Sequence, residues 1–296
     1  MSVPLASLAA LVRAVVACAL LGGLVFPCGA HALVCPPPPA GIRLAASGRA
    51  SFDELAVAGR IVGGIAPHHD VAGAMILRFY ATLKASGLSP KRVVLIAPDH
   101  YRAGRSAVTV CGADWETRAG KLPADEGMVG AVVRSGAATR DDRIFVREHG
   151  VTTHLPLIRA TFPETVVIPL AIRSSASDLQ LLALRKVLLP FLRDGGLVIL
   201  SMDLSHGKTP ERAALEDERT LPTLLRGDVS SLKGLDVDSP RGAALFLALV
   251  RELGDQLRPL RSPSAASVVL DHTDSGAILN RLDEPCTSYA TMLFAK

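Results

Sequence analysis

The sequence has few aromatic residues and no long run of like charges. Phe, Trp and Tyr make up 4% of its 296 residues, and 32 basic against 28 acidic residues give a formal net charge of +4. Proteins that bind nucleic acid need a concentrated basic surface, and binders of single strands add aromatic side chains for stacking. Because the sequence has neither, we expect no nucleic-acid partner. The 49% hydrophobic and 20% charged residues indicate a globular protein, not a disordered or polytopic membrane one.

Charge is nearly absent from the start of the chain, where Arg13 is the single charged residue before Arg43. Arg13 precedes an uncharged stretch over residues 14–26, Pro27 interrupts it, and Ala30-His31-Ala32 has the small-x-small pattern of a cleavage site. These features are typical of a secretory signal. An uncleaved anchor helix is the alternative, but a membrane span needs about 20 uninterrupted apolar residues.

We therefore predict a signal peptide over residues 1–32, a Pro-rich leader over 33–59 and one domain over 60–296. Four consecutive prolines follow Cys35 and favour a stiff polyproline conformation. The mature chain is expected to be exported, periplasmic or secreted, with no stable membrane span. Its oligomeric state is left open.

Cysteine is also scarce, since Cys35, Cys111 and Cys286 alone remain after the predicted signal is removed. In an oxidising compartment one pair could form a disulfide, and the sequence does not choose the pair. CxxC, GxGxxG, GKS/T, GxSxG and HExxH are all absent. Their absence argues against a zinc ribbon, a phosphate-binding loop, an α/β-hydrolase nucleophile and a zincin protease.

Short apolar runs alternate with amphipathic stretches from Arg60 onward, which predicts one α/β domain with a largely parallel central sheet flanked by helices. The expected strands are 60–66, 92–97, 106–110, 166–172, 197–201, 266–270 and 289–294. The expected helices are 71–86, 124–134, 178–192, 211–225 and 241–253, and Gly87 suits the end of the first.

Histidines follow three of the expected strands: His68 and His69 the first, His100 the second, and His206 the strand ending near Ser201. In open α/β sheets the ligand crevice lies beyond the carboxyl ends of the strands. We therefore expect these imidazoles to meet at one edge, although a single loop histidine is more often solvated or a cap.

Other candidates surround this set. Glu148, His149 and His154 lie in one loop, and Asp203 stands three residues before His206. That spacing allows Asp203 to orient the imidazole and hold its tautomer, or else to cap the next helix. Imidazoles with a carboxylate suit several transition metals, so the spacing alone does not select one.

Four segments resemble, in order and spacing, the successive motifs of the MEMO family, also called AmmeMemoRadiSam system protein B. They are Gly64-Ile65-Ala66-Pro67-His68, Ala97-Pro98-Asp99-His100, Glu148-His149 with His154-Leu155-Pro156, and Ser201-Met202-Asp203-Leu204-Ser205-His206. The resemblance runs from about Arg60 to the carboxyl terminus, where Ser288-Tyr289-Ala290 is similar to the family's closing strand. It implies a fold similar to the class III extradiol dioxygenases of the LigB type.

The resemblance also implies a metal site, with His68 and His100 as ligands and His206 as the acid/base. Where the family commonly has a cysteine ligand, this chain has Asp238 as the best match. Two imidazoles and one carboxylate favour Fe(II), with Cu or Zn as further candidates. Asp238 before Ser-Pro could instead cap the helix that follows.

The chain departs from the family at several positions. The usual Pro-His-Ala-Gly-Tyr reads Pro67-His68-His69-Asp70-Val71, Thr152 stands where a glutamate is frequent, and the final motif reads His272-Thr273-Asp274-Ser275. We expect His69, Glu148, His149, His154 and His272 to line the pocket.

The leading functional expectation is a metal-dependent, dioxygenase-like oxidoreductase acting on a small organic substrate. His206, oriented by Asp203, would move protons. A copper or iron carrier without turnover and a peptide-binding module using the same cleft are the alternatives.

Overall fold

The computed structural model describes residues 32–37, 59–254, 267–282 and 284–296. The predicted signal peptide, most of the leader and residues 255–266 lie outside this part. The strands are β1 Leu33–Val34, β2 Ile61–Ala66, β3 Arg92–Pro98, β4 Val108–Val110, β5 Trp115–Thr117, β6 Gly120–Leu122, β7 Thr139–Arg140, β8 Val166–Ile172, β9 Gly196–Ser201, β10 His206–Lys208, β11 Ser267–Asp274 and β12 Cys286–Ala295. The helices are α2 Gly73–Ala85, α3 Glu126–Arg134, α4 His149–Thr152, α5 Leu155–Thr161, α6 Asp178–Arg193, α7 Pro210–Leu225, α8 Pro240–Leu253 and α9 Ser275–Leu279, with 3-10 turns η1 Asp70–Ala72, η2 Asp142–Arg147 and η3 Val229–Leu232.

The main sheet has the strand order β10-β12-β2-β9-β3-β8-β4-β7, with β11 paired to β12. Its four central strands, β2, β9, β3 and β8, are parallel, whereas β12 and β4 join them antiparallel. The expected α/β domain is therefore confirmed. The sheet is mixed, because β12 and β4 run antiparallel to the central strands. A separate small sheet has the order β1-β5-β6.

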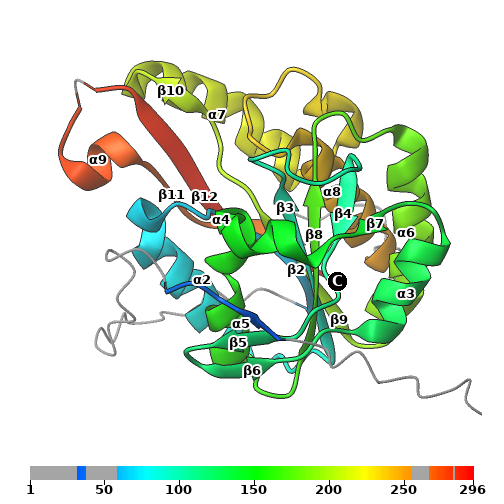
Figure 1. Cartoon of the computed structure of the whole chain (residues 1–296). Helices are drawn as coiled ribbons and strands as arrows, with labels where there is room; N and C mark the ends of the chain where they lie inside the picture. Colours follow the sequence, from blue (N-terminus) through cyan, green and yellow to red (C-terminus); the bar gives the residue numbers. More distant parts are fainter. Residues whose placement is uncertain (1–31, 38–58, 255–266, 283) are drawn as a thin grey trace, which may run out of the picture. The chain divides into compact units, whose positions relative to one another are not determined.

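Helices cover both faces of the central strands, which explains why those strands are apolar throughout (Figure 1). Alternate residues of β3 point to opposite sides: Val94 and Ile96 pack with α3, α6 and α8, while Val93 and Leu95 pack with α2 and α5. The predicted helices agree with the structure to within two or three residues. The first is split, with η1 preceding α2, and it ends before Gly87, whose φ is +71°.

Three features differ from the expectations. Leu33 and Val34, which we had assigned to the Pro-rich leader, pair in parallel with Trp115 and Glu116 of β5. The β5–β6 hairpin and the short elements α4, α5, β10 and α9 were not expected, because each is too short to show a hydrophobic period. Cys35, Cys111 and Cys286 are buried and free, so no disulfide forms among them. No helix in the described ranges is both long and apolar enough to cross a membrane.

Strand β2 packs closely against α2 because Gly64 has no side chain, and this contact provides a test of the core. A Cβ at Gly64 would lie 2.6 Å from two ring atoms of Phe79 and 3.0 Å from the carbonyl oxygen of Met292. We expect Gly64→Ala to lower the free energy of unfolding in urea by about 1–3 kcal/mol, as overpacked cores do. Gly127→Ala is the matched control, because its Cβ would meet nothing nearer than 3.4 Å and helix α3 favours alanine. Equal midpoints for the two variants would contradict this packing.

Candidate metal centre

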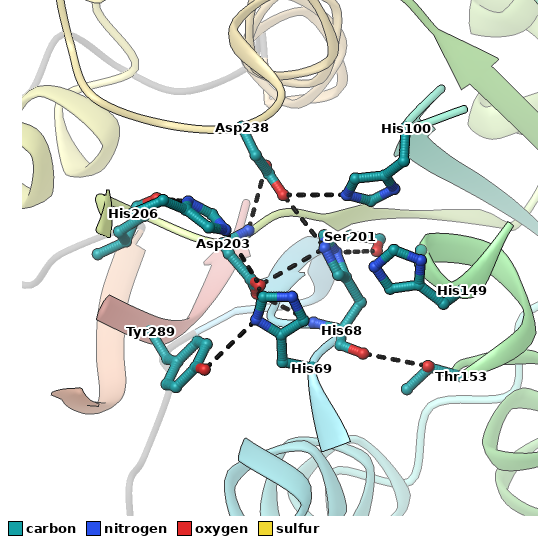
Figure 2. A network of polar contacts seen from close by, with 12 residues as sticks. His68, His69, His100, His149, Thr153, Ser201, Asp203, His206, Asp238 and Tyr289 are labelled. Atoms are coloured by element: carbon teal, nitrogen blue, oxygen red, sulfur yellow. Dashed lines mark hydrogen bonds and ion pairs between the residues drawn. The ribbon is translucent and has the colours of Figure 1, made fainter. Parts of the chain in front are cut away.

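The carboxyl ends of three neighbouring parallel strands deliver the central side chains of the site. Ala66 of β2 is in register with Ser201 of β9, and β9 also pairs with β3. The chain leaves β2 into His68, leaves β3 into His100 and leaves β9 into Asp203. The structure thus brings together the side chains that the sequence places after separate strands (Figure 2).

Asp238 lies close to both imidazoles that the family resemblance implies as ligands. Its Oδ2 lies 3.1 Å from Nε2 of His68 and 3.8 Å from Nε2 of His100. Its Oδ1 accepts a hydrogen bond from the N–H of Asp203 at 3.2 Å, and its own N–H donates to the carbonyl of Asp203 at 3.3 Å. Helix α8 has Ser239 as its N-cap residue, without a side-chain cap. Asp238 is therefore not a helix cap; it is tied to the segment after β9.

Polar groups behind the two imidazoles fix their orientation. Nδ1 of His68 lies 3.0 Å from the hydroxyl of Ser201. Nδ1 of His100 lies 2.6 Å from Oε1 of Glu148, whose Oε2 accepts the backbone N–H of His100 at 3.0 Å. A carboxylate can only accept, so Nδ1 of His100 carries a proton directed at Glu148, and Nε2 faces Asp238. Glu148 is thus buried behind the site, whereas we had expected it to line the pocket.

Two more predicted lining residues lie elsewhere. His154 is fully buried, with Nδ1 2.9 Å from the hydroxyl of Tyr80. His272 pairs with Asp217 of α7, at 2.7 Å between Nε2 and Oδ2. In contrast, His149 lies at the site, its ring stacked on that of His100 with centroids 4.1 Å apart.

Asp203 contacts more imidazoles than the sequence suggested. Its Oδ2 is 2.8 Å from Nδ1 of His69, 3.5 Å from Nε2 of His68 and 3.9 Å from Nε2 of His206. The ring of His206 is oriented by the carbonyl of Leu204, 2.9 Å from its Nδ1. Asp203 accepts no hydrogen bond from His206 in this arrangement, although we had expected it to orient that ring.

Sequence reasoning assigned no role to several supporting residues. The hydroxyl of Tyr289 in β12 lies 3.3 Å from Nδ1 of His69, and the hydroxyl of Thr153 donates to the carbonyl of His68 at 3.1 Å. Tyr289 was noted only as part of the closing strand, and Thr153 stands in no motif, so their places follow from the pairing of β12 with β2 and the position of α4. Ser201 is the exception, since it ends a predicted strand.

The electrostatics of the cluster are those of buried carboxylates surrounded by imidazoles. Burial by itself lowers the pKa of His68 and His100, but nearby carboxylates outweigh it. Asp203 and Asp238 raise the pKa of His68. Asp238 and Glu148 raise the pKa of His100 to about 9. Burial opposes ionisation of Asp238, yet both imidazoles hold its pKa well below the usual range. Burial and the positive charge of His100 lower the pKa of His149 to about 4.

The unpartnered atoms at the centre fit a metal ion. Nε2 of His68, Oδ2 of Asp203 and Oδ2 of Asp238 are buried and have no hydrogen-bond partner among the described residues. Donors each about 2.0–2.2 Å from one ion lie roughly 3 Å apart at a right angle and about 4.4 Å apart at most. The separations of 3.1 and 3.8 Å around Asp238 fall in this range. Three overlapping groups at this edge could hold a metal: His68, His100 and His149; His68, His69 and Asp203; and Asp203, His206 and Asp238.

Comparison with known proteins identifies the class of this fold and site. The family model for Memo-like proteins matches residues 54–292. The chain belongs to this family.

The similar proteins have low sequence identity to this chain but match it over most or about half of its length. A MEMO1 family protein of Pyrobaculum arsenaticum is 25% identical over 250 residues, covering 79% of this chain and 84% of that protein. Another from Thermotoga maritima is 30% identical over 168 residues, 55% of each chain. The crystal structure of an uncharacterized protein from Escherichia coli K12 is similar in fold, with a TM-score of 0.51 at 12% identity, covering 80% of this chain and all of that one.

The buried His154 provides a pH test of the wall behind the site. Burial, followed by the positive charge of His68, lowers the pKa of His154 to about 3, whereas an unfolded histidine titrates near 6.5. The unfolded chain therefore binds the proton first as the pH falls. Stability from this group is present above about pH 6.5 and is lost below it, by up to about 1.4 kcal/mol per pH unit.

We expect urea unfolding to show the wild type losing its advantage over His154→Gln between pH 7 and pH 5. Tyr80→Phe removes the hydrogen bond but keeps the imidazole, so it should retain the steep pH dependence. Parallel stability curves for the wild type and His154→Gln would contradict a neutral, buried His154.

Proposed function

We propose that the protein is a mononuclear metal-dependent oxidoreductase that acts on a small organic substrate. The observation that carries the proposal is the approach of Nε2 of His68 and Nε2 of His100 to Oδ2 of Asp238, at 3.1 and 3.8 Å, with no hydrogen bond on the two buried atoms from His68 and Asp238. A buried carboxylate and imidazole without hydrogen bonds are costly unless another charged group completes them.

The donor set favours iron. Two imidazoles and one carboxylate match the set that holds Fe(II) in non-haem oxygenases, whereas Cu(I) prefers sulfur. Cys35, Cys111 and Cys286 belong to none of the candidate metal groups in the described chain. Once bound by these residues, a ferrous ion would supply redox chemistry with dioxygen.

The surrounding side chains have separate tasks in this proposal. Ser201 and Glu148 hold His68 and His100 with Nε2 directed inward. His206 is more exposed than Asp203 and has its Nδ1 engaged by Leu204, which leaves Nε2 to move a proton between substrate and solvent. His149 lies on His100 and would contact a bound substrate.

Iron-loaded protein should consume dioxygen with catechol-like substrates, and His100→Ala and Asp238→Ala should each lose bound iron and oxygen uptake together. Removing one of three protein ligands leaves two, which is too few to retain the ion through dialysis. Iron content by mass spectrometry and uptake with an oxygen electrode measure both effects.

His272→Gln is the control, since its imidazole pairs with Asp217 outside the site, and it should keep both iron and oxygen uptake. Undiminished iron in both ligand variants would contradict the assignment. Tight iron binding without uptake would instead indicate a metal carrier.

We further propose that the chain is exported and cleaved after Ala32. The basic residue, apolar stretch and Ala-x-Ala pattern of residues 13–32 support it. Leu33 would then start the mature chain, with its nitrogen 2.7 Å from the carbonyl of Asp114.

Expressed in a Gram-negative host, the full chain should appear in the periplasm with Leu33 as its first residue, because the signal peptidase removes the small-x-small segment. Sequencing of the amino terminus checks the cut, and a chain starting at Met-Leu33 is the cytoplasmic control. A full-length product in the cytoplasm would contradict export.

A further inference from the structure

A groove that shares no residue with the metal centre lies between α6, α8 and the segment that contains η3. Its volume is about 620 Å³, within the roughly 300–1,000 Å³ typical of small-molecule sites. One wall is formed by residues between Val229 and Leu235, and the chain continues from there into Asp238. The groove is therefore a separate site, although a short segment connects it to the metal centre.

Two ion pairs hold α6 and α8 side by side along the groove (Figure 1). Oδ1 of Asp178 lies 2.6 Å from Nη2 of Arg241, where both helices begin. Nε of Arg185 lies 2.9 Å from Oε1 of Glu252, further along both helices. The helices therefore run in the same direction. About 10 Å of helix axis separates Asp178 from Arg185, so the groove between the pairs suits an elongated occupant.

The floor of the groove is apolar. Leu181, Leu232 and Leu245 line it, and all three are buried. Ala244 and Ala248 stand one turn apart on α8 and also line the groove, where their single methyl groups leave space. Apolar surface is covered more favourably by hydrocarbon than by water. A hydrocarbon chain is therefore the favoured occupant of the floor.

The charges that line the groove favour an anion. Arg185, Lys233 and Arg241 contribute three positive charges, against the single carboxylate of Asp178. Each arginine pairs with one carboxylate, whereas Lys233 pairs with none among the described residues. A guanidinium has five N–H donors, so both arginines keep donors beyond their ion pairs. An occupant with one negative group would complement this lining.

We propose that this groove binds a small amphipathic acid, an unbranched alkyl chain that ends in a carboxylate. The chain lies on the leucines and alanines between the two ion pairs, and the carboxylate accepts hydrogen bonds from a basic side chain of the lining. Such charge-assisted bonds are stronger than those to a neutral head group. This inference does not depend on the proposed metal function, because the groove and the metal centre have no residue in common.

Isothermal titration calorimetry of the purified chain with octanoate tests the proposal, and 1-octanol is the neutral probe with the same chain length. We expect one octanoate per chain and an affinity at least about tenfold higher than that for 1-octanol, because only the carboxylate makes charge-assisted hydrogen bonds. Equal affinities for the two probes, or no binding of octanoate, would overturn the proposal.

Leu182 provides a matched pair of variants, because it lines the groove and is 37% exposed, so a polar side chain there should not disturb folding. Leu182→Glu places a second carboxylate beside the bound one and should weaken octanoate binding at least about tenfold. Leu182→Gln has nearly the same size without the charge and should bind octanoate more tightly than Leu182→Glu. Thermal unfolding of both variants checks their folding, and equal affinities for the two would place the ligand elsewhere.

A carboxylate could also bind to a metal ion, so the titration is repeated with His100→Ala. This variant should bind octanoate as the wild type does, because the groove lies apart from His100. Loss of binding in His100→Ala would place the carboxylate at the metal centre and overturn the groove as its site. Iron content and oxygen uptake are measured separately, so failure of the groove proposal leaves the proposed function standing.

Discussion

The parallel alignment of β2, β9 and β3 is the constraint on which the site depends. Parallel strands end at a common edge, and the pairing of Ala66 with Ser201 places the residues that follow β2 and β9 side by side. His68 and Asp203 then meet through a backbone hydrogen bond to Oδ1. A shift of one residue in that pairing would turn both side chains to the other face, so the register of a hydrophobic sheet also determines the polar geometry.

The side chains at the carboxyl edge of the sheet are held together because the loops that follow the strands are hydrogen-bonded to one another. Asp203 and Asp238 exchange two hydrogen bonds that involve their backbones, and these connect the end of β9 to the start of α8. Glu148 does the same for β3, since one carboxylate holds both the backbone and the imidazole of His100 and also accepts the N–H of Gly150 at the start of α4. The charged atoms are thereby placed by loops that already have their own partners.

The sequence predicts the scaffold better than the details of the site. Apolar runs with period 2 or 3.6 identify the central strands and the long helices, and the histidines after the strands indicate the edge where they meet. Short elements such as α4 and β10 have no such period. The roles of Glu148, His154 and Tyr289 depend on contacts between segments far apart in the chain, so a residue that looked like a pocket wall, His154, is a buried partner of Tyr80.

Family membership explains the fold, whereas the particular donors of this site depend on residues in which this chain departs from the family motifs. Belonging to the Memo-like family accounts for the fold. Membership does not explain two departures from the family motifs. Asp238 stands where the motif commonly has cysteine, and His69, beside Asp203, stands where it usually has alanine. Each departure introduces an oxygen or nitrogen donor. A buried carboxylate is stable here only with positive charge near it. Imidazoles surround Asp203 and Asp238, and the other ring nitrogens of His68, His100 and His206 have partners of their own. The two departures therefore act in the same direction, because both supply nitrogen or oxygen donors, which suit harder ions than a thiolate does.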